Sequence, residues 1–194
     1  MAVESALHDD DVLLRKEAEF YIAEVGTKMP KIAELASKAK QATALTAWKP
    51  FGHLSEDTGI KLNREGGDQT TKGSLQKPKL RVDIKNVEFS MEVGTIQFDK
   101  SNLKRIFGMD ATEAENGFLG ASINPQTENV AVLVIVKDAD RILALGGEKV
   151  AVAANGEINL TDAENFVSAP LKFTFLQGAD GRTLWVSPVT KIAA

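Results

Sequence analysis

Apolar and polar residues alternate over most of this chain with the period of two that predicts β-strands. In the clearest stretch, residues 79–98, apolar side chains occupy even positions from Leu80 to Ile84 and odd positions from Val87 to Val93. A shift of one residue moves every later side chain to the opposite face of a sheet. The sequence therefore predicts a bulge or a tight turn at Lys85-Asn86, between two strand segments.

Further strands are predicted from short apolar or β-branched runs that are bounded by turn residues. Their ranges are Ala18–Val25, Asn129–Val136, Arg141–Leu145, Lys149–Ala153, Glu157–Leu160, Leu171–Leu176 and Thr183–Val186. Asn155-Gly156 and Asp180-Gly181 are residue pairs typical of two-residue hairpin turns. The polar stretch Gly59–Pro78 is predicted as a long loop, and loops of that length are functional or disordered more often than idle.

Residues spaced as on one face of a helix occur in two segments of the chain. Residues 31–44 are rich in Ala and Lys and could form one helix with Pro30 near its first turn. A short helix over residues 99–107 is better marked by its ends and by one apolar face. The residues that mark it are Asp99 or Ser101 as the N-cap, Leu103, Ile106 and Phe107 on the apolar face, and Gly108 as a left-handed stop.

Many short strands and one clear helix predict a mostly β fold, an antiparallel sandwich or barrel. The 194 residues suit one domain, and 43% hydrophobic with 26% charged residues exclude a disordered chain. We expect an acidic N-terminal arm over residues 1–13 and a C-terminal tail over residues 188–194. Between them we expect a single β domain over residues 14–187, which includes a flexible basic loop over residues 60–79.

The charge is unevenly distributed along the chain. Residues 61–85 hold seven basic and three acidic side chains, so this segment carries a net charge of +4. The rest of the chain carries −8, and together they give the net charge of −4. An acidic chain disfavours a dedicated nucleic-acid-binding surface. The absence of cysteine excludes disulfides and cysteine-based metal or catalytic sites. With neither a signal peptide nor an apolar membrane span in the sequence, we expect a protein made in a cytoplasm.

Candidate catalytic and cofactor sites are weak. His53, Ser55 and Asp57 are too close in sequence to converge as a nucleophilic triad, and His53, Glu56 and Asp57 lack a fourth metal ligand. The stretch 66–73 departs from the phosphate-loop pattern at its second Gly and at its final Ser or Thr. We therefore predict no enzymatic activity, no metal and no cofactor.

One motif is specific. It comprises a strand that ends in Gly-Thr-x-x-Pro and, after a spacer, Trp-Lys-Pro-Phe-Gly-His-Leu-Ser-Glu-Asp-Thr-Gly. Its marker residues are Gly26, Thr27, Pro30, Trp48, Gly52, Ser55, Glu56, Asp57 and Gly59. This pattern resembles the N-terminal third of the major tail tube proteins of long-tailed, non-contractile phages (siphoviruses), especially those of actinobacterial hosts. Phe51 replaces the Leu of the family pattern and Thr58 is inserted before Gly59, while the resemblance continues in type and order over residues 14–187.

The resemblance implies a structural protein of the virion. Such proteins form six-subunit rings that stack into a tail tube, through which double-stranded DNA passes without specific binding. The implied partners are further copies of the chain, the tape measure protein, the tail terminator and the distal tail or baseplate proteins, with no membrane. The motif residues themselves are read as structural marks of the fold.

A tube subunit needs a channel-facing surface and a contact between rings. The polar positions of the strand after the basic loop, Glu88, Ser90 and Glu92, would face the lumen or solvent, and we expect Glu88 and Glu92 as lumen acids that repel DNA phosphates. Phe89 and Met91 would face the subunit core. The candidate ring-to-ring residues are the cations Lys61, Arg64, Lys72, Lys77 and Lys79, and the acidic arm is one possible partner for them. The alternative is that these cations only keep a loop soluble.

A second class of function stays open on sequence alone. A β-sandwich could bind carbohydrate or protein on a virion or cell surface. Sugar-binding faces usually expose aromatic side chains, and this chain has only two Trp and one Tyr.

Overall fold

The computed structural model describes residues 12–160 and 164–193, which fall into two compact units. Unit 1 contains Met1–His53, Thr127–Ala151 and Leu176–Ala194, and unit 2 contains Leu54–Gln126 and Val152–Phe175. The described residues are mostly β-strand, and the strands pair in antiparallel fashion, which confirms the predicted fold class. One domain over residues 14–187 stays a prediction.

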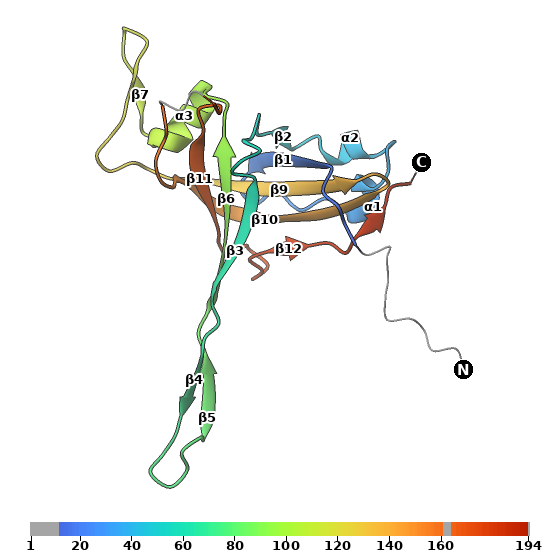
Figure 1. Cartoon of the computed structure of the whole chain (residues 1–194), viewed down its shortest axis with the longest axis vertical. Helices are drawn as coiled ribbons and strands as arrows, with labels where there is room; N and C mark the ends of the chain where they lie inside the picture. The colour runs from blue at the N-terminus through green and yellow to red at the C-terminus, as the bar shows by residue number, and fades with distance from the viewer. Residues whose placement is uncertain (1–11, 161–163, 194) are drawn as a thin grey trace. The chain divides into compact units, whose positions relative to one another are not determined.

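Unit 1 is built on a sheet with the strand order β2-β1-β9-β10 (Figure 1). Its strands are β1 Glu17–Glu24, β2 Lys49–Pro50, β9 Glu128–Asp138, β10 Arg141–Ala154, β12 Trp185–Val186 and β13 Thr190–Lys191. Both β12 and β13 pair with β10. The segment predicted as a C-terminal tail therefore contains a paired strand. Most of the predicted N-terminal arm, residues 1–11, lies outside the described residues.

Strand β9 is the centre of the core of unit 1. Its residues from Val130 to Ile135 are all buried, so both faces of the strand are covered. One face, Ala131, Leu133 and Ile135, packs with Leu35, Ala36 and Trp48. A continuous apolar run of this length is what a strand needs when neither face meets water.

Residues 31–44 form two short helices, α1 Ile32–Leu35 and α2 Gln41–Ala44, so the single helix is wrong. The backbone at the end of α1 pairs with the backbone of the C-terminal segment. The amide of Ala193 donates to the carbonyl of Ala36, and Ser37 forms a parallel bridge with Ala193. This pairing takes the chain out of the helical path, as tertiary contacts often do against weak propensity.

The two strands predicted at 141–145 and 149–153 are one strand, β10. The sequence hides this because Gly146-Gly147 looks like an interruption. A Cβ on Gly146 would lie 2.1 Å from the carbonyl oxygen of Val132 on β9. Glycine at this place therefore serves a close approach of two backbones within the sheet rather than a turn.

Unit 2 contains the strand order β11-β6-β3 and two separate hairpins. Its elements are β3 Ile60–Gly66, β4 Gln69–Lys72, β5 Arg81–Ile84, β6 Val87–Thr95, α3 Lys100–Phe107, β7 Thr112–Glu113, β8 Leu119–Gly120 and β11 Ala169–Phe175. The core face of the sheet carries Met91, Val93, Leu171 and Phe173, all fully buried. The fold confirms that Met91 faces the core.

The predicted loop Gly59–Pro78 is wrong over most of its length, because β3 and β4 lie within it. Strand β3 pairs with β6, and β4 pairs with β5, so residues 60–95 form one long antiparallel ribbon, which β11 widens to three strands at its base (Figure 1). The sequence of β4, Gln-Thr-Thr-Lys, contains no apolar residue, and all four residues are exposed. Its strand conformation comes from pairing with a partner strand, and that signal is absent from its own sequence.

The predicted break at Lys85-Asn86 is confirmed. The β3–β6 pairing ends at Gly66 and Val87, and the β4–β5 pairing begins at Gln69 and Ile84. Gly66 and Gly67 have φ values of 78° and 75° on the facing strand. A Cβ on Gly66 would lie 2.2 Å from the carbonyl oxygen of Asn86, so glycine permits this close crossing.

Helix α3 has the predicted N-cap. A carboxylate oxygen of Asp99 accepts hydrogen bonds from the amides of Ser101 at 2.9 Å and Asn102 at 3.1 Å. Gly108 ends the helix with φ 109° and ψ 140°, so it is a positive-φ stop with an extended ψ and not the expected left-handed helical one.

The predicted strand at 157–160 does not form. The amide of Asn155 donates to the carbonyl of Pro170, and beyond that bond the chain leaves the sheet through Gly156, whose φ is 107°. The strand predicted at 183–186 is reduced to β12.

Candidate assembly surfaces

The polar face of the β3–β6–β11 sheet carries both candidate lumen acids. Three pairings order this face: Glu65 lies opposite Glu88, Ser90 lies between Asn63 and Thr174, and Glu92 lies between Lys61 and Lys172. The face is therefore a mixture of charges in which the two candidate acids have different surroundings.

Glu88 and Glu92 differ in exposure and in neighbours. Glu88 is exposed and has another carboxylate, Glu65, at the opposite position. Glu92 is half-buried, accepts a hydrogen bond from the Asn155 amide at 3.2 Å, and has a lysine opposite it on each side. Free negative charge on this face is therefore concentrated at Glu88. The assignment of both acids to a lumen stays a prediction.

The expected exposure of Ser90 is wrong. Its side chain is 2% exposed although it lies on the polar face. Strand β6 is the central strand here, and Asn63 and Thr174 on the neighbouring strands are themselves half-buried. Small polar side chains in the middle of a sheet are thus covered by their cross-strand neighbours.

The basic segment forms the outer part of the ribbon, and we call residues 69–84, with strands β4 and β5, the ribbon tip. On one face of the tip, Asp83 accepts from Lys72 at 2.7 Å and from Arg81 at 2.9 Å. At its base, Lys85 lies 3.8 Å from Asp68. Among the described residues, no ion pair is found for the exposed Lys77 or Lys79 at the turn of the hairpin.

The other face of the ribbon tip carries exposed apolar residues on β5 opposite Gln69 and Thr71 of β4, and their exposure was missed from the sequence. Leu80, Val82 and Ile84 alternate with the charged residues and are 61%, 54% and 64% exposed. We call these three residues the apolar stripe. Their alternation predicted a strand, and nothing in the sequence showed which of its sides is covered. Only the tertiary structure places that side in solvent.

The first part of the family motif shapes a turn and a core contact in unit 1. Gly26 has φ 84° and its amide donates to the carbonyl of Glu148 at 2.7 Å. The Thr27 hydroxyl donates to the carbonyl of Glu24 at 2.7 Å. Trp48 is 5% exposed in the core, which is the anchoring role expected of a tryptophan. Phe51 is also buried, with its ring 5.2 Å from that of Phe20 in an edge-on arrangement.

The second part of the motif forms a turn in unit 2. The Ser55 amide donates to the carbonyl of Gly94 at 2.8 Å, and the Ser55 carbonyl accepts from Gly59 at 3.0 Å. Gly59 has φ 61°, and Gly52, just before the turn, has φ 116°. Both values favour glycine. Glu56 and Asp57 are exposed on this turn.

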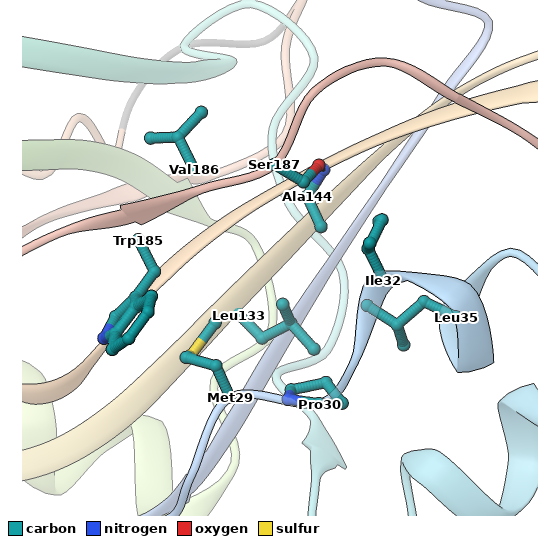
Figure 2. A pocket seen from close by; sticks show the side chains of 9 residues that line it. All are labelled: Met29, Pro30, Ile32, Leu35, Leu133, Ala144, Trp185, Val186 and Ser187. Carbon is teal, nitrogen blue, oxygen red and sulfur yellow. The ribbon is translucent and has the colours of Figure 1, made fainter.

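An apolar hollow of about 110 Å³ lies in unit 1 (Figure 2). Its lining residues are Met29, Pro30, Ile32, Leu35, Leu133, Ala144, Trp185, Val186 and Ser187. The guanidinium of Arg182 lies 4.5 Å from the centre of the Trp185 ring. The motif residue Pro30 thus forms part of a hydrophobic wall, and Ser187 is the only polar residue in it.

A buried carboxylate near the motif was also missed from the sequence. Glu148 is 5% exposed, and the Lys28 ammonium donates to it at 2.8 Å. This hydrogen bond raises the pKa of Lys28. Burial, together with the neighbouring Glu19, raises the pKa of Tyr21 to about 12. Both groups therefore keep their protons at neutral pH.

Within residues 12–160 and 164–193, no three His, Asp or Glu side chains are arranged to hold a metal ion. Among these residues, no helix is long and apolar enough to cross a membrane.

Comparison with known proteins gives a consistent result. A family model described as phage tail tube protein matches residues 5–192. The chain is 34% identical over 180 residues to the major tail protein Gp23 of Mycobacterium phage D29, with 90% of this chain and 89% of the relative covered. It is also 34% identical over 182 residues to the major tail protein Gp23 of Mycobacterium phage L5, with the same coverage. The resemblance inferred from the motif is confirmed, and the chain belongs to the phage tail tube protein family.

Proposed function

We propose that this protein is the structural subunit of a phage tail tube and that it assembles into six-subunit rings, which stack around a channel for DNA. The observation that carries the proposal is the family match over residues 5–192, nearly the whole chain. In the virion the protein lies in the tail, and its assembly takes place in the host cytoplasm. Its role is structural and not enzymatic.

The open sheet edges support a ring. Strands β2 and β3 stand at the two ends of the strand order, so each has an edge without a partner among the described strands. Unpaired edges invite further strands, and natural proteins cover or close them. A head-to-tail ring brings two different surfaces of neighbouring subunits together and closes such edges.

The polar face around Glu88 is the proposed channel surface. Glu88 is exposed and lies opposite Glu65, so this end of the face repels phosphate. Glu92 contributes less, because Lys61 and Lys172 flank it. A wall of this kind lets DNA pass without adhering to it.

The ribbon is the proposed contact between rings. Its cations Arg64, Lys72, Lys77 and Lys79 give a surface of positive charge in an otherwise acidic chain, whereas the fifth candidate, Lys61, lies opposite Glu92 on the proposed channel face. Residues 1–13, with their carboxylates, are a candidate for the opposing surface. The further partners are the tape measure protein along the channel, the terminator at one end of the tube and the distal tail proteins at the other.

Negative-stain electron microscopy of the concentrated protein tests the proposal. Hollow tubes or stacked rings of uniform width are expected. Particles of single-subunit size at every concentration, also when the other tail proteins are produced with it, would contradict the proposal and favour a binding module. Charge reversal of Lys72, Lys77 and Lys79 to Glu is expected to slow tube growth and change its salt dependence.

A further inference from the structure

The chain contains two Asn-Gly pairs, Asn116-Gly117 and Asn155-Gly156, and the structure holds them in different ways. In such a pair the side-chain carbonyl carbon of Asn and the backbone nitrogen of Gly can approach each other with little hindrance, because glycine has no Cβ. A bond between these two atoms is the first step in the loss of the side-chain amide. The rate therefore depends on how freely the two atoms can meet.

The pair Asn116-Gly117 lies in the turn of the β7–β8 hairpin. Both residues are exposed, Gly117 has φ 82°, and a Cβ added to it would meet no atom within 4 Å. The side-chain oxygen of Asn116 accepts a hydrogen bond from the Phe118 amide at 3.2 Å, which folds the side chain over the Gly117 peptide. That same oxygen becomes negative when the carbonyl carbon is attacked, so the Phe118 amide stabilises the attacked state.

Only a short hairpin opposes the attack. The Gly117 amide donates to the carbonyl of Ala114 at 2.9 Å, and the Ala114 amide donates to the carbonyl of Phe118 at 2.8 Å. Beyond these bonds, β7 and β8 share just two residue pairs. A two-stranded hairpin of this size is marginal in water and opens locally at low cost. Opening releases the Gly117 nitrogen, which can then attack.

Asn155 has the opposite surroundings. It is half-buried, its backbone amide donates to the carbonyl of Pro170 at 2.9 Å, and its side-chain nitrogen donates to the Glu92 carboxylate at 3.2 Å. A Cβ on Gly156 would lie 3.5 Å from the Pro170 ring, so the space beside this glycine is filled. These contacts tie Asn155 to strands β6 and β11. The negative charge of Glu92 also disfavours an anion at the neighbouring amide.

We propose that Asn116 is a site of spontaneous deamidation in the folded subunit and that Asn155 is protected from it. The Gly117 nitrogen bonds to the side-chain carbonyl carbon of Asn116, and the bond from that carbon to Nδ2 breaks. Ammonia leaves with the proton of the Gly117 amide. Water then opens the resulting succinimide ring at either carbonyl carbon, which gives aspartate or isoaspartate.

The product changes the charge of the hairpin. Each event adds a negative charge to a chain whose net charge is −4, next to the existing carboxylates of Glu113 and Glu115. Isoaspartate also lengthens the backbone of the turn by one carbon atom. Deamidation at Asn116 does not depend on the proposed function, because it occurs in the free subunit.

Peptide mass spectrometry of the purified chain tests the proposal. Trypsin places the two asparagines on separate peptides, residues 106–137 and 150–172, and a sample digested before incubation gives the baseline. In mildly alkaline buffer we expect Asn116 to convert at least about tenfold faster than Asn155 in the folded chain. In concentrated urea the two rates should agree within about twofold, because neither pair is then held by the fold.

Two results would overturn the proposal. One is equal rates at the two asparagines in the folded chain. The other is an Asn116 as slow as Asn155 in the folded chain while both react in urea.

Charge variants give an independent readout. Asn116→Asp marks the product, Asn116→Gln removes the reactive group because glutamine would have to close a larger ring, and Asn155→Gln is the matched control. The aged unaltered chain should form an acidic species that elutes with Asn116→Asp in anion exchange. Asn155→Gln should form it at an unaltered rate, and Asn116→Gln should not form it. The same acidic species growing at an unaltered rate in Asn116→Gln would contradict the assignment.

Discussion

Strand β9 and the ribbon tip are both β-structure with apolar residues, but these side chains are buried in β9 and exposed in the ribbon tip. Six consecutive residues of β9 are buried, and the strand is covered on both faces. In β5 every second residue is apolar, and its apolar side chains are exposed. Alternation therefore says which side chains share a face, but not whether the molecule itself covers that face. In an assembling protein the cover can come from another subunit.

The largest expected effect comes from making the same substitution in both regions. Leu133→Ala leaves a cavity at a site with 0% exposure and is expected to lower the free energy of unfolding by about 2–5 kcal/mol. Leu80→Ala, at 61% exposure, is expected to change it by less than about 0.5 kcal/mol. Chemical denaturation of the free subunit measures both. Similar losses for the two variants would mean that the subunit packs its own ribbon.

The next largest effect concerns the close approach of β10 to β9. Gly146→Ala brings a Cβ to 2.1 Å from the Val132 carbonyl oxygen, so the strands must separate. We expect a loss of about 1–3 kcal/mol in the free energy of unfolding, as for other overpacked sites. Gly120→Ala is the control, because its nearest atom would be at 3.8 Å. If Gly146→Ala left the free energy of unfolding unchanged, β10 would be able to move away from β9 without loss of stability.

A smaller effect is expected at the start of α3. Asp99→Ala removes the acceptor for the amides of Ser101 and Asn102 and should cost about 1 kcal/mol of stability. Asp99→Asn retains a capping oxygen and should recover most of the loss. Thermal unfolding of the two variants gives the comparison, and an Asn variant as weak as the Ala variant would argue against a capping role.

The smallest effect is a pH dependence in unit 2. Hydrogen bonds hold the pKa of two carboxyls below their usual values: the Lys100 ammonium acts on Glu113, and the Gln126 amide acts on Asp110. The stabilisation is therefore complete above the unfolded pKa values of 4.5 and 3.8 and is lost as pH falls through the lower folded values. Nuclear magnetic resonance should show the Gln126 amide signal shift only below those values. A shift near neutral pH would contradict this assignment.

Several features of the fold were determined by local sequence and were predicted correctly. The break at Lys85-Asn86 follows from a change of parity, and the start of α3 follows from a capping aspartate. The tail tube family was recognised from glycines, a proline and a tryptophan at fixed spacing, because turns and a core anchor leave few alternatives at these positions.

Other features depended on partners distant in sequence. Strand β4 has no apolar pattern and exists because β5 pairs with it, and β10 continues through Gly146 because the backbone of β9 leaves no room there for a Cβ. The burial of Ser90 and the exposure of Val82 are the reverse of what alternation alone suggests. The family, the strands with alternating apolar residues and the capped helix could be predicted from the sequence, since they depend on neighbouring residues. Which faces are covered became visible only in the folded chain, because burial depends on what lies opposite in space.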